Sequence, residues 1–155
     1  MKRKDRELTR EQALEIVDRC IYGVVSAVTP EGIPYAVPVD LVRDGDRLYF
    51  HCAHTGLKTD CLRHEPRVCV TFVDSRAEID QPGLTTLYAS AIVNADASEI
   101  TDKEEKIRAL HLLCQRFAPE HPRSSGDFSE CLSITAVWQL QIKEITGKAN
   151  RGKQQ

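Results

Sequence analysis

Three strand-like runs follow one another between residues 22 and 52, with no room for a helix between them. YGVVSAVT precedes the turn Pro30-Glu31-Gly32, IPYAVPVDLV precedes Asp44-Gly45, and RLYFHC completes the series. Their β-branched and aromatic residues favour strands, and the intervening residues favour tight turns. Because parallel strands need crossovers of about a dozen residues or more, these runs predict antiparallel strands joined by short turns.

The rest of the chain alternates helix-like and strand-like segments. Thr9 and Gln12 form a capping box before a helix over residues 10–19. Further segments are predicted as a helix at 55–64, a strand at 67–73, a loop at 74–83, a strand at 84–100 bent near Asn94, a helix capped by Thr101-Asp102, a loop at 119–130 and a strand at 134–147. These elements predict a mainly β fold with α-helices, an antiparallel sheet closed into a small barrel with about three peripheral helices.

Length and charge narrow the class of protein. The 155 residues predict a single domain over residues 1–150 and a polar tail over 151–155. A net charge of −2 predicts neither a nucleic-acid partner nor an anionic membrane partner. The charged N-terminus lacks an apolar segment, and the six cysteines include no CxxC pair. Reduced thiols and a cytoplasmic location are therefore expected.

The segment YFHCAHTGLKTDCLRHEP, residues 49–66, holds most of the chemically active side chains. His51 and His54 are three apart, as are Cys61 and His64, but structural zinc sites usually use thiolate pairs in tight knuckles. His51 and Cys52 would also point to opposite faces of a strand. We therefore predict no metal site. Cys52 and Cys61 each lie among apolar neighbours, which favours core residues over catalytic thiolates.

The same segment also fits an anion site. Free N–H groups at the start of the helix near Thr55 carry the positive end of its dipole. Gly56 would let a ligand approach the backbone, and Lys58 adds a positive charge within the first turn. A capped helix with a solvated lysine explains the same residues equally well.

The order of the motifs resembles one protein family. A P-x-G turn, P-Y-x-V-P-V, D-G-D, Y-F-H-C-A, G-x-K and a late V-W-x-L-x-I-x-x-I-T-G-K extend from about residue 9 to residue 149. This series resembles the FMN-binding split barrels related to pyridoxamine 5′-phosphate oxidase, and within them most closely the nitroimidazole-resistance proteins. The resemblance implies a homodimer with FMN at the subunit interface.

The resemblance also implies roles for particular residues. Lys58 matches the phosphate-binding lysine, and Trp138 matches an aromatic residue contributed by the partner subunit. The backbone along the flavin ring matches Val37, Pro38, Val39 and Asp40, and the end of the third strand matches His51, Cys52 and Ala53. From the sequence alone, Trp138 is equally a core residue, and Pro34 and Pro38 predict an edge strand.

Leu57 stands where oxidase relatives commonly have an arginine. Further phosphate donors would then be needed, with His54, Thr55, Arg63 and Lys148 as candidates, and FAD is an alternative to FMN. The expected function is a flavin-dependent oxidoreductase that reduces a small acceptor, such as a nitroaromatic. His51 is the candidate proton donor, or else a packing residue. The alternative is a non-catalytic flavin- or haem-binding storage or sensor protein.

Overall fold

The computed structural model describes residues 3–74, 78–122, 126, 128 and 130–152. Its strands are β1 (Glu7–Leu8), β2 (Tyr22–Val28), β3 (Pro34–Asp40), β4 (Val42–Asp44), β5 (Arg47–Cys52), β6 (Arg67–Val73), β7 (Glu78–Asp80), β8 (Thr85–Glu99) and β9 (Ala136–Asn150). Its helices are the short 3₁₀ turn η1 (Lys4–Arg6), then α1 (Arg10–Arg19), α2 (Leu57–His64) and α3 (Lys103–Phe117).

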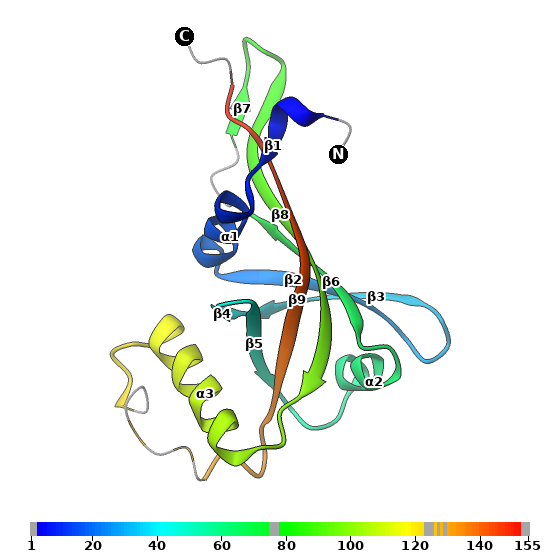
Figure 1. Ribbon diagram of the computed structural model, residues 1–155, viewed down its shortest axis with the longest axis vertical. Helices are drawn as coiled ribbons and strands as arrows, with labels where there is room; N and C mark the ends of the chain where they lie inside the picture. Colours follow the sequence, from blue (N-terminus) through cyan, green and yellow to red (C-terminus); the bar gives the residue numbers. More distant parts are fainter. Residues whose placement is uncertain (1–2, 75–77, 123–125, 127, 129, 153–155) are drawn as a thin grey trace.

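The strands form one antiparallel sheet in the order β3-β2-β6-β8-β9-β5-β4, with β1 added to β9 and β7 to β8. The long strands β8 and β9 run side by side through most of the molecule (Figure 1). The predicted antiparallel split barrel with three peripheral helices is confirmed. The expected closure is not, because β3 and β4 remain the two edges of the sheet.

The run IPYAVPVDLV is not the single strand that its composition predicts. It divides at Leu41 into β3, which pairs with β2, and β4, which pairs with β5 at the opposite edge. Leu41 and Val42 are both buried, so the alternation of inward and outward side chains stops here. The chain bends and crosses the open side of the barrel, and the three runs do not form one meander.

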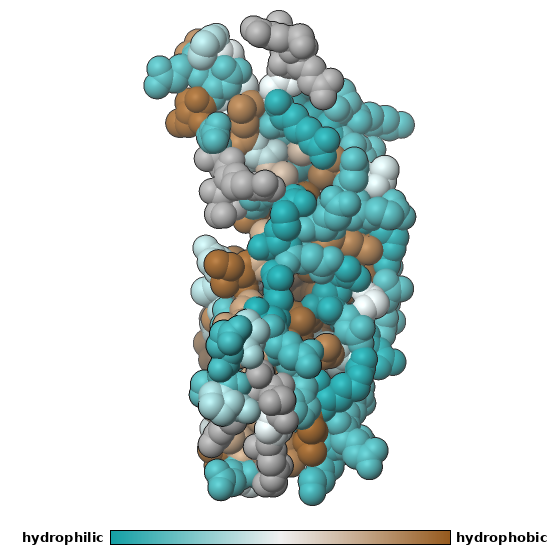
Figure 2. Space-filling model, turned by 90° about the vertical axis from the view of Figure 1, so that its left-hand side faces the viewer, coloured by the Kyte–Doolittle hydropathy of each residue, from teal (hydrophilic) through white to brown (hydrophobic). Residues whose placement is uncertain are grey.

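Two apolar clusters hold the sheet and helices together. The main core lies between the sheet and α1 and includes Ile16, Phe50, Phe72 and Trp138. A smaller cluster lies under α3. The side of the molecule that carries α1 and α3 is mainly hydrophilic, with hydrophobic side chains in small separate spots (Figure 2).

Most predicted boundaries hold, with four corrections. The capping box of Thr9 and Gln12 and the helix at 10–19 are confirmed, as is an irregularity in β8 at Asn94/Ala95. However, α2 begins at Leu57 and not at Thr55, β7 lies inside the predicted loop, β8 begins at Thr85 and ends at Glu99, and β9 runs from Ala136 to Asn150. Residues 75–77 of that loop and parts of the loop at 119–130 lie outside the described residues.

Helix α1 packs so closely on β9 that only glycine fits at residue 147. A Cβ added to Gly147 would lie 2.8 Å from Ala13 Cβ and 3.2 Å from Ala13 Cα, which is backbone. We expect Gly147→Ala to lower the free energy of unfolding by about 1–3 kcal/mol, because the helix must move. Urea unfolding measures this loss. Thr146→Ala, on the other face of β9, is the control and should change stability by less than about 1 kcal/mol.

Candidate functional site

The turn between β5 and α2 leaves the start of the helix open. Gly56 is the N-cap of α2 and has φ +134°, a conformation that favours glycine. It offers no side-chain cap, and a Cβ added there would meet no atom within 4 Å. Thr59 Oγ1 donates a hydrogen bond of 2.8 Å to the Gly56 carbonyl and fixes the first turn. No side chain therefore caps the first N–H groups of α2.

Lys58 is the second residue of α2 and adds a positive charge to this opening. Its Nζ lies 5.4 Å from the centroid of the Phe50 ring, and the side chain is half-buried. The expected alternative was a capped helix with a fully solvated lysine, and the structure shows neither the side-chain cap nor full solvation of Lys58. An uncapped N-terminus beside an anchored lysine is suited to bind an anion.

His51 and Cys52 point to opposite sides of β5, as the strand geometry predicts. His51 is exposed, whereas Cys52 is half-buried and packs against the main core. Burial raises the pKa of the Cys52 thiol, and the nearby Lys58 ammonium only partly opposes the effect. Burial likewise raises the pKa of the Cys61 thiol. Both thiols are therefore neutral near pH 7, which agrees with core residues.

The histidines of this segment differ in their surroundings. His54 Nδ1 lies 3.5 Å from Glu99 Oε1, whereas His51 is exposed on β5. Within the described ranges, no group of three or more His, Cys, Asp and Glu side chains is placed to hold a metal ion.

Two of the proposed extra phosphate donors have other partners. Arg63 Nη2 donates to Glu99 Oε2 at 2.8 Å and to the His54 carbonyl at 3.0 Å. Lys148 lies far along β9 from Ala136, which is the residue that pairs with Cys52. Its Nζ sits 5.8 Å from the Tyr88 ring centroid. Lys58, in the first turn of α2 and near Cys52 at the end of β5, is thus the leading candidate for a phosphate-binding cation.

The strand with two prolines is an edge strand, as predicted. β3 pairs only with β2 within the described chain, so its outer backbone groups have no neighbouring strand. Val39 is buried and Val37 half-buried, while Pro38 and Asp40 are exposed. A ligand lying along this edge could use the backbone that a further strand would otherwise occupy.

Trp138 lies in the main core and is only 2% exposed. The Arg63 guanidinium carbon lies 5.8 Å from the centroid of the Trp138 ring, and Trp138 Nε1 has no hydrogen-bond partner among the described residues. The sequence allowed Trp138 to be either a core residue or an aromatic contributed to the partner's site, and in the single chain it lies in the core. In the single chain, no face of the ring is open to a partner's ligand.

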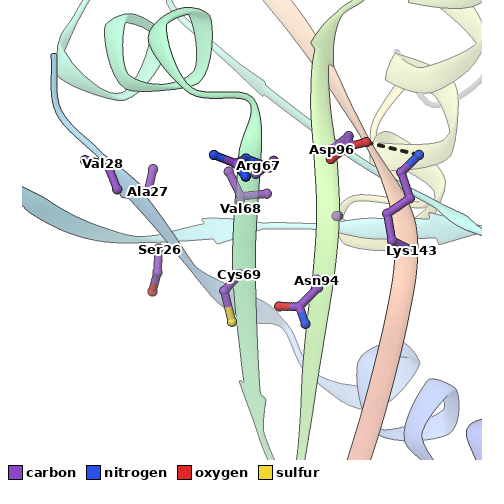
Figure 3. A pocket seen from close by; sticks show the side chains of 10 residues that line it. Ser26, Ala27, Val28, Arg67, Val68, Cys69, Asn94, Asp96 and Lys143 are labelled. Carbon is purple, nitrogen blue, oxygen red and sulfur yellow. Dashed lines mark ion pairs between the residues drawn. The ribbon is translucent and has the colours of Figure 1, made fainter. Parts of the chain in front are cut away.

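A groove that the sequence analysis did not identify lies on the outer face of the sheet. Its volume is about 510 Å³, and Ser26, Cys69 and Asn94 stand side by side on β2, β6 and β8 (Figure 3). The ion pair of Lys143 with Asp96, 3.0 Å long, lies at one end. The groove contains none of the predicted site residues. Positions on four separate strands, β2, β6, β8 and β9, line it, and their neighbourhood depends on the order of strands in the sheet.

The open antiparallel sheet with three helices outside it is consistent with the split-barrel class of proteins. The chain belongs to the family described as pyridoxamine 5′-phosphate oxidase, whose sequence profile matches residues 9–149. No curated protein matches the chain significantly. Among the described residues, no helix is both long and apolar enough to span a membrane.

Several solved structures share the fold at low sequence identity. A candidate 5-nitroimidazole antibiotic resistance protein from Bacteroides thetaiotaomicron has a TM-score of 0.80 and 23% identity, over 92% of this chain and 85% of that one. The flavocytochrome Anf3 from Azotobacter vinelandii has a TM-score of 0.78 and 22% identity, over 93% of this chain and 68% of that one. The FAD and haem binding protein from Mycobacterium smegmatis has a TM-score of 0.81 and 21% identity, over 97% of this chain and 76% of that one.

Proposed function

We propose that this protein binds a flavin and uses it to reduce a small acceptor, with a nitroaromatic as the leading class. Membership of the family supports the proposal. Similar folds that are named for flavin binding, FAD binding or nitroimidazole resistance also support it. The observation that carries it is the open N-terminus of α2, with Gly56 at the cap and Lys58 in the first turn.

The residues present fit a flavin phosphate and ring. Lys58 and the first N–H groups of α2 would hold the phosphate, since both are positive and both belong to the first turn of the helix. The outer backbone of β3, from Val37 to Asp40, would lie along the ring. Cys52 and Ala53 would contribute backbone groups from the end of β5. Either FMN or FAD presents the phosphate that this arrangement needs, and we propose FMN as the resident form.

His51 has the exposure that a proton donor to a small acceptor requires. A bound flavin would supply electron and hydride transfer, and the protein would bind, orient and tune it. An imidazole can deliver a proton near neutral pH, so His51 is assigned to protonate the reduced acceptor. The neutral Cys52 thiol, whose pKa burial raises, packs against the main core on the side of β5 opposite to His51 and would not act as a nucleophile.

Turnover tests the enzymatic part of this proposal. Flavin-loaded protein should oxidise a reduced nicotinamide cofactor faster when a nitroimidazole is present than when it is absent. His51→Ala should lower kcat while leaving flavin occupancy within about twofold of the wild type, because the side chain touches the acceptor and not the phosphate. Flavin-loaded protein that gives no acceptor-dependent turnover would support a storage or sensor role.

We further propose that two copies of the chain associate through the outer face of the sheet. Alternate residues of β2, β6 and β8 fill the core, and those between them point outward. Tyr22, Val73 and Ile92 on this outer face are 57%, 58% and 36% exposed. An apolar strip on a sheet face is a common basis for self-association, whereas the α1 and α3 side is mainly hydrophilic (Figure 2).

A charge placed on this strip should separate the two copies. We expect Ile92→Glu to convert the dimer to a monomer, because the interface would bury an unpaired carboxylate. Sedimentation velocity measures the mass. The matched control is Ile134→Glu, at an isoleucine 71% exposed before β9. A dimeric Ile92→Glu variant, or a monomeric wild-type protein, would contradict the proposal.

Haem binding is the second candidate function. The flavocytochrome and the FAD and haem binding protein, both with this fold, favour it. His51 is exposed, and His54 is held by its Nδ1 near Glu99, so its Nε2 would be the nitrogen available to an iron. A Soret band in the purified protein would identify haem, and flavin absorption bands would identify a flavin.

A further inference from the structure

Arg63 connects three segments that are far apart in the sequence. It lies in the last turn of α2, and its Nη2 donates to the carbonyl of His54 at 3.0 Å and to Glu99 Oε2 at 2.8 Å. Its guanidinium carbon also lies 5.8 Å from the centroid of the Trp138 ring. One side chain thus joins the turn before α2 to the ends of β8 and β9.

This arrangement holds the turn at His54. Residues 53–56 connect β5 to α2 and contain no regular secondary structure. Glu99 holds Arg63 through Oε2, while its Oε1 lies 3.5 Å from His54 Nδ1. The Glu99 carboxylate therefore accepts a hydrogen bond from Arg63 and lies near the His54 side chain. Arg63 also donates a hydrogen bond to the His54 carbonyl. Contacts to both the backbone and the side chain of His54 restrict the turn.

We propose that Arg63 is a positioning residue that holds the turn at residues 53–56 in the shape that exposes the N-terminus of α2. The inference rests on the proposed flavin site and deepens it, since Gly56 and Lys58 follow this turn directly. In this arrangement the Nη2 of Arg63 is used by Glu99 and His54. Its effect on the ligand is to keep the turn ordered before the ligand binds.

The three contacts together make Arg63 more than an ordinary surface ion pair. Isolated pairs on the surface contribute little, and the Arg63 side chain is 44% exposed. Here, however, Glu99 is only 26% exposed, and the planar guanidinium also faces an aromatic ring. A lysine could keep the charge near Glu99 but could not reproduce the planar contacts with His54 and Trp138 at the same time.

Amide hydrogen exchange on flavin-free protein tests the proposal without depending on any ligand. We expect Arg63→Ala to raise exchange at the Asp60 amide, which donates to the Gly56 carbonyl at 3.0 Å, by about tenfold, the factor that loss of one hydrogen bond to a charged group produces. Arg63→Lys should restore global stability and only part of this protection. The control is Arg67→Ala, which removes a 2.6 Å ion pair with Glu65 just beyond the same helix and should leave exchange at the Asp60 amide unchanged.

Two further readings separate this inference from the proposed function. Trp138 is the only tryptophan, so a change in its fluorescence in Arg63→Ala reports the loss of the guanidinium at the ring. Flavin titration of the same variant should show about tenfold weaker binding. Unchanged exchange at the Asp60 amide in Arg63→Ala and Arg63→Lys would overturn the positioning role. If Arg63→Ala increases exchange but the wild-type protein takes up no flavin, the positioning role stands and only the flavin site is refuted.

Discussion

Lys58→Ala should weaken flavin binding by about tenfold to a hundredfold, equivalent to about 1.4–2.8 kcal/mol. The ammonium lies in the first turn of α2, beside backbone N–H groups that a phosphate would also contact. Its removal leaves the helix terminus as the main source of positive charge at the opening. Fluorescence titration of flavin-free protein with FMN measures the change, and the wild-type affinity should fall as salt concentration rises.

A second lysine provides a matched control for this substitution. Lys103 is the first residue of α3 and is exposed, so Lys103→Ala also removes a cation from the start of a helix. It should leave flavin affinity unchanged. Lys58→Arg should retain most of the affinity, because it keeps the charge. Equal affinity of Lys58→Ala and the wild type would show that the phosphate binds elsewhere.

Trp138→Ala should lower the free energy of unfolding by about 3–5 kcal/mol. The indole is 2% exposed and lies in the main core with Phe50 and Leu140, so its loss would leave a large cavity. Urea unfolding followed by circular dichroism measures the effect. Such a loss is a large fraction of the stability of a typical domain of this size.

The smaller substitution Trp138→Phe distinguishes a core role from a ligand role. Phenylalanine fills part of the space, so we expect an intermediate loss of stability and flavin affinity within about twofold of the wild type. Ile134→Ala, at an exposed position, serves as the stability control. If Trp138→Phe kept full stability but lost the flavin, Trp138 would be a ligand contact, as the family resemblance implies.

The elements that depend on neighbouring residues could be predicted from the sequence. Thr9 and Gln12 define the start of α1, and Pro34 and Pro38 mark β3 as an edge strand, because both signals depend on local backbone chemistry. The break at Leu41 was not predictable in this way. Whether consecutive apolar residues continue a strand or cross the barrel depends on the core that receives them.

The candidate site was predictable to the same extent. Gly56 and Lys58 follow directly from a strand–turn–helix pattern, so the residues themselves indicate an anion site. The contact between Arg63 and Glu99 joins residues 36 positions apart and requires the pairing of β8 with β9. The groove at Ser26, Cys69 and Asn94 likewise depends on the order of strands. No local pattern carries that information.

The central claim, that the protein binds a flavin, is tested most directly by releasing the ligand from freshly purified protein. Absorbance and mass spectrometry of the released molecule identify it, and flavin-free protein can then be titrated with FMN and FAD. We predict that FMN is recovered, or is taken up by the flavin-free protein. A colourless protein that binds neither FMN nor FAD would contradict the account.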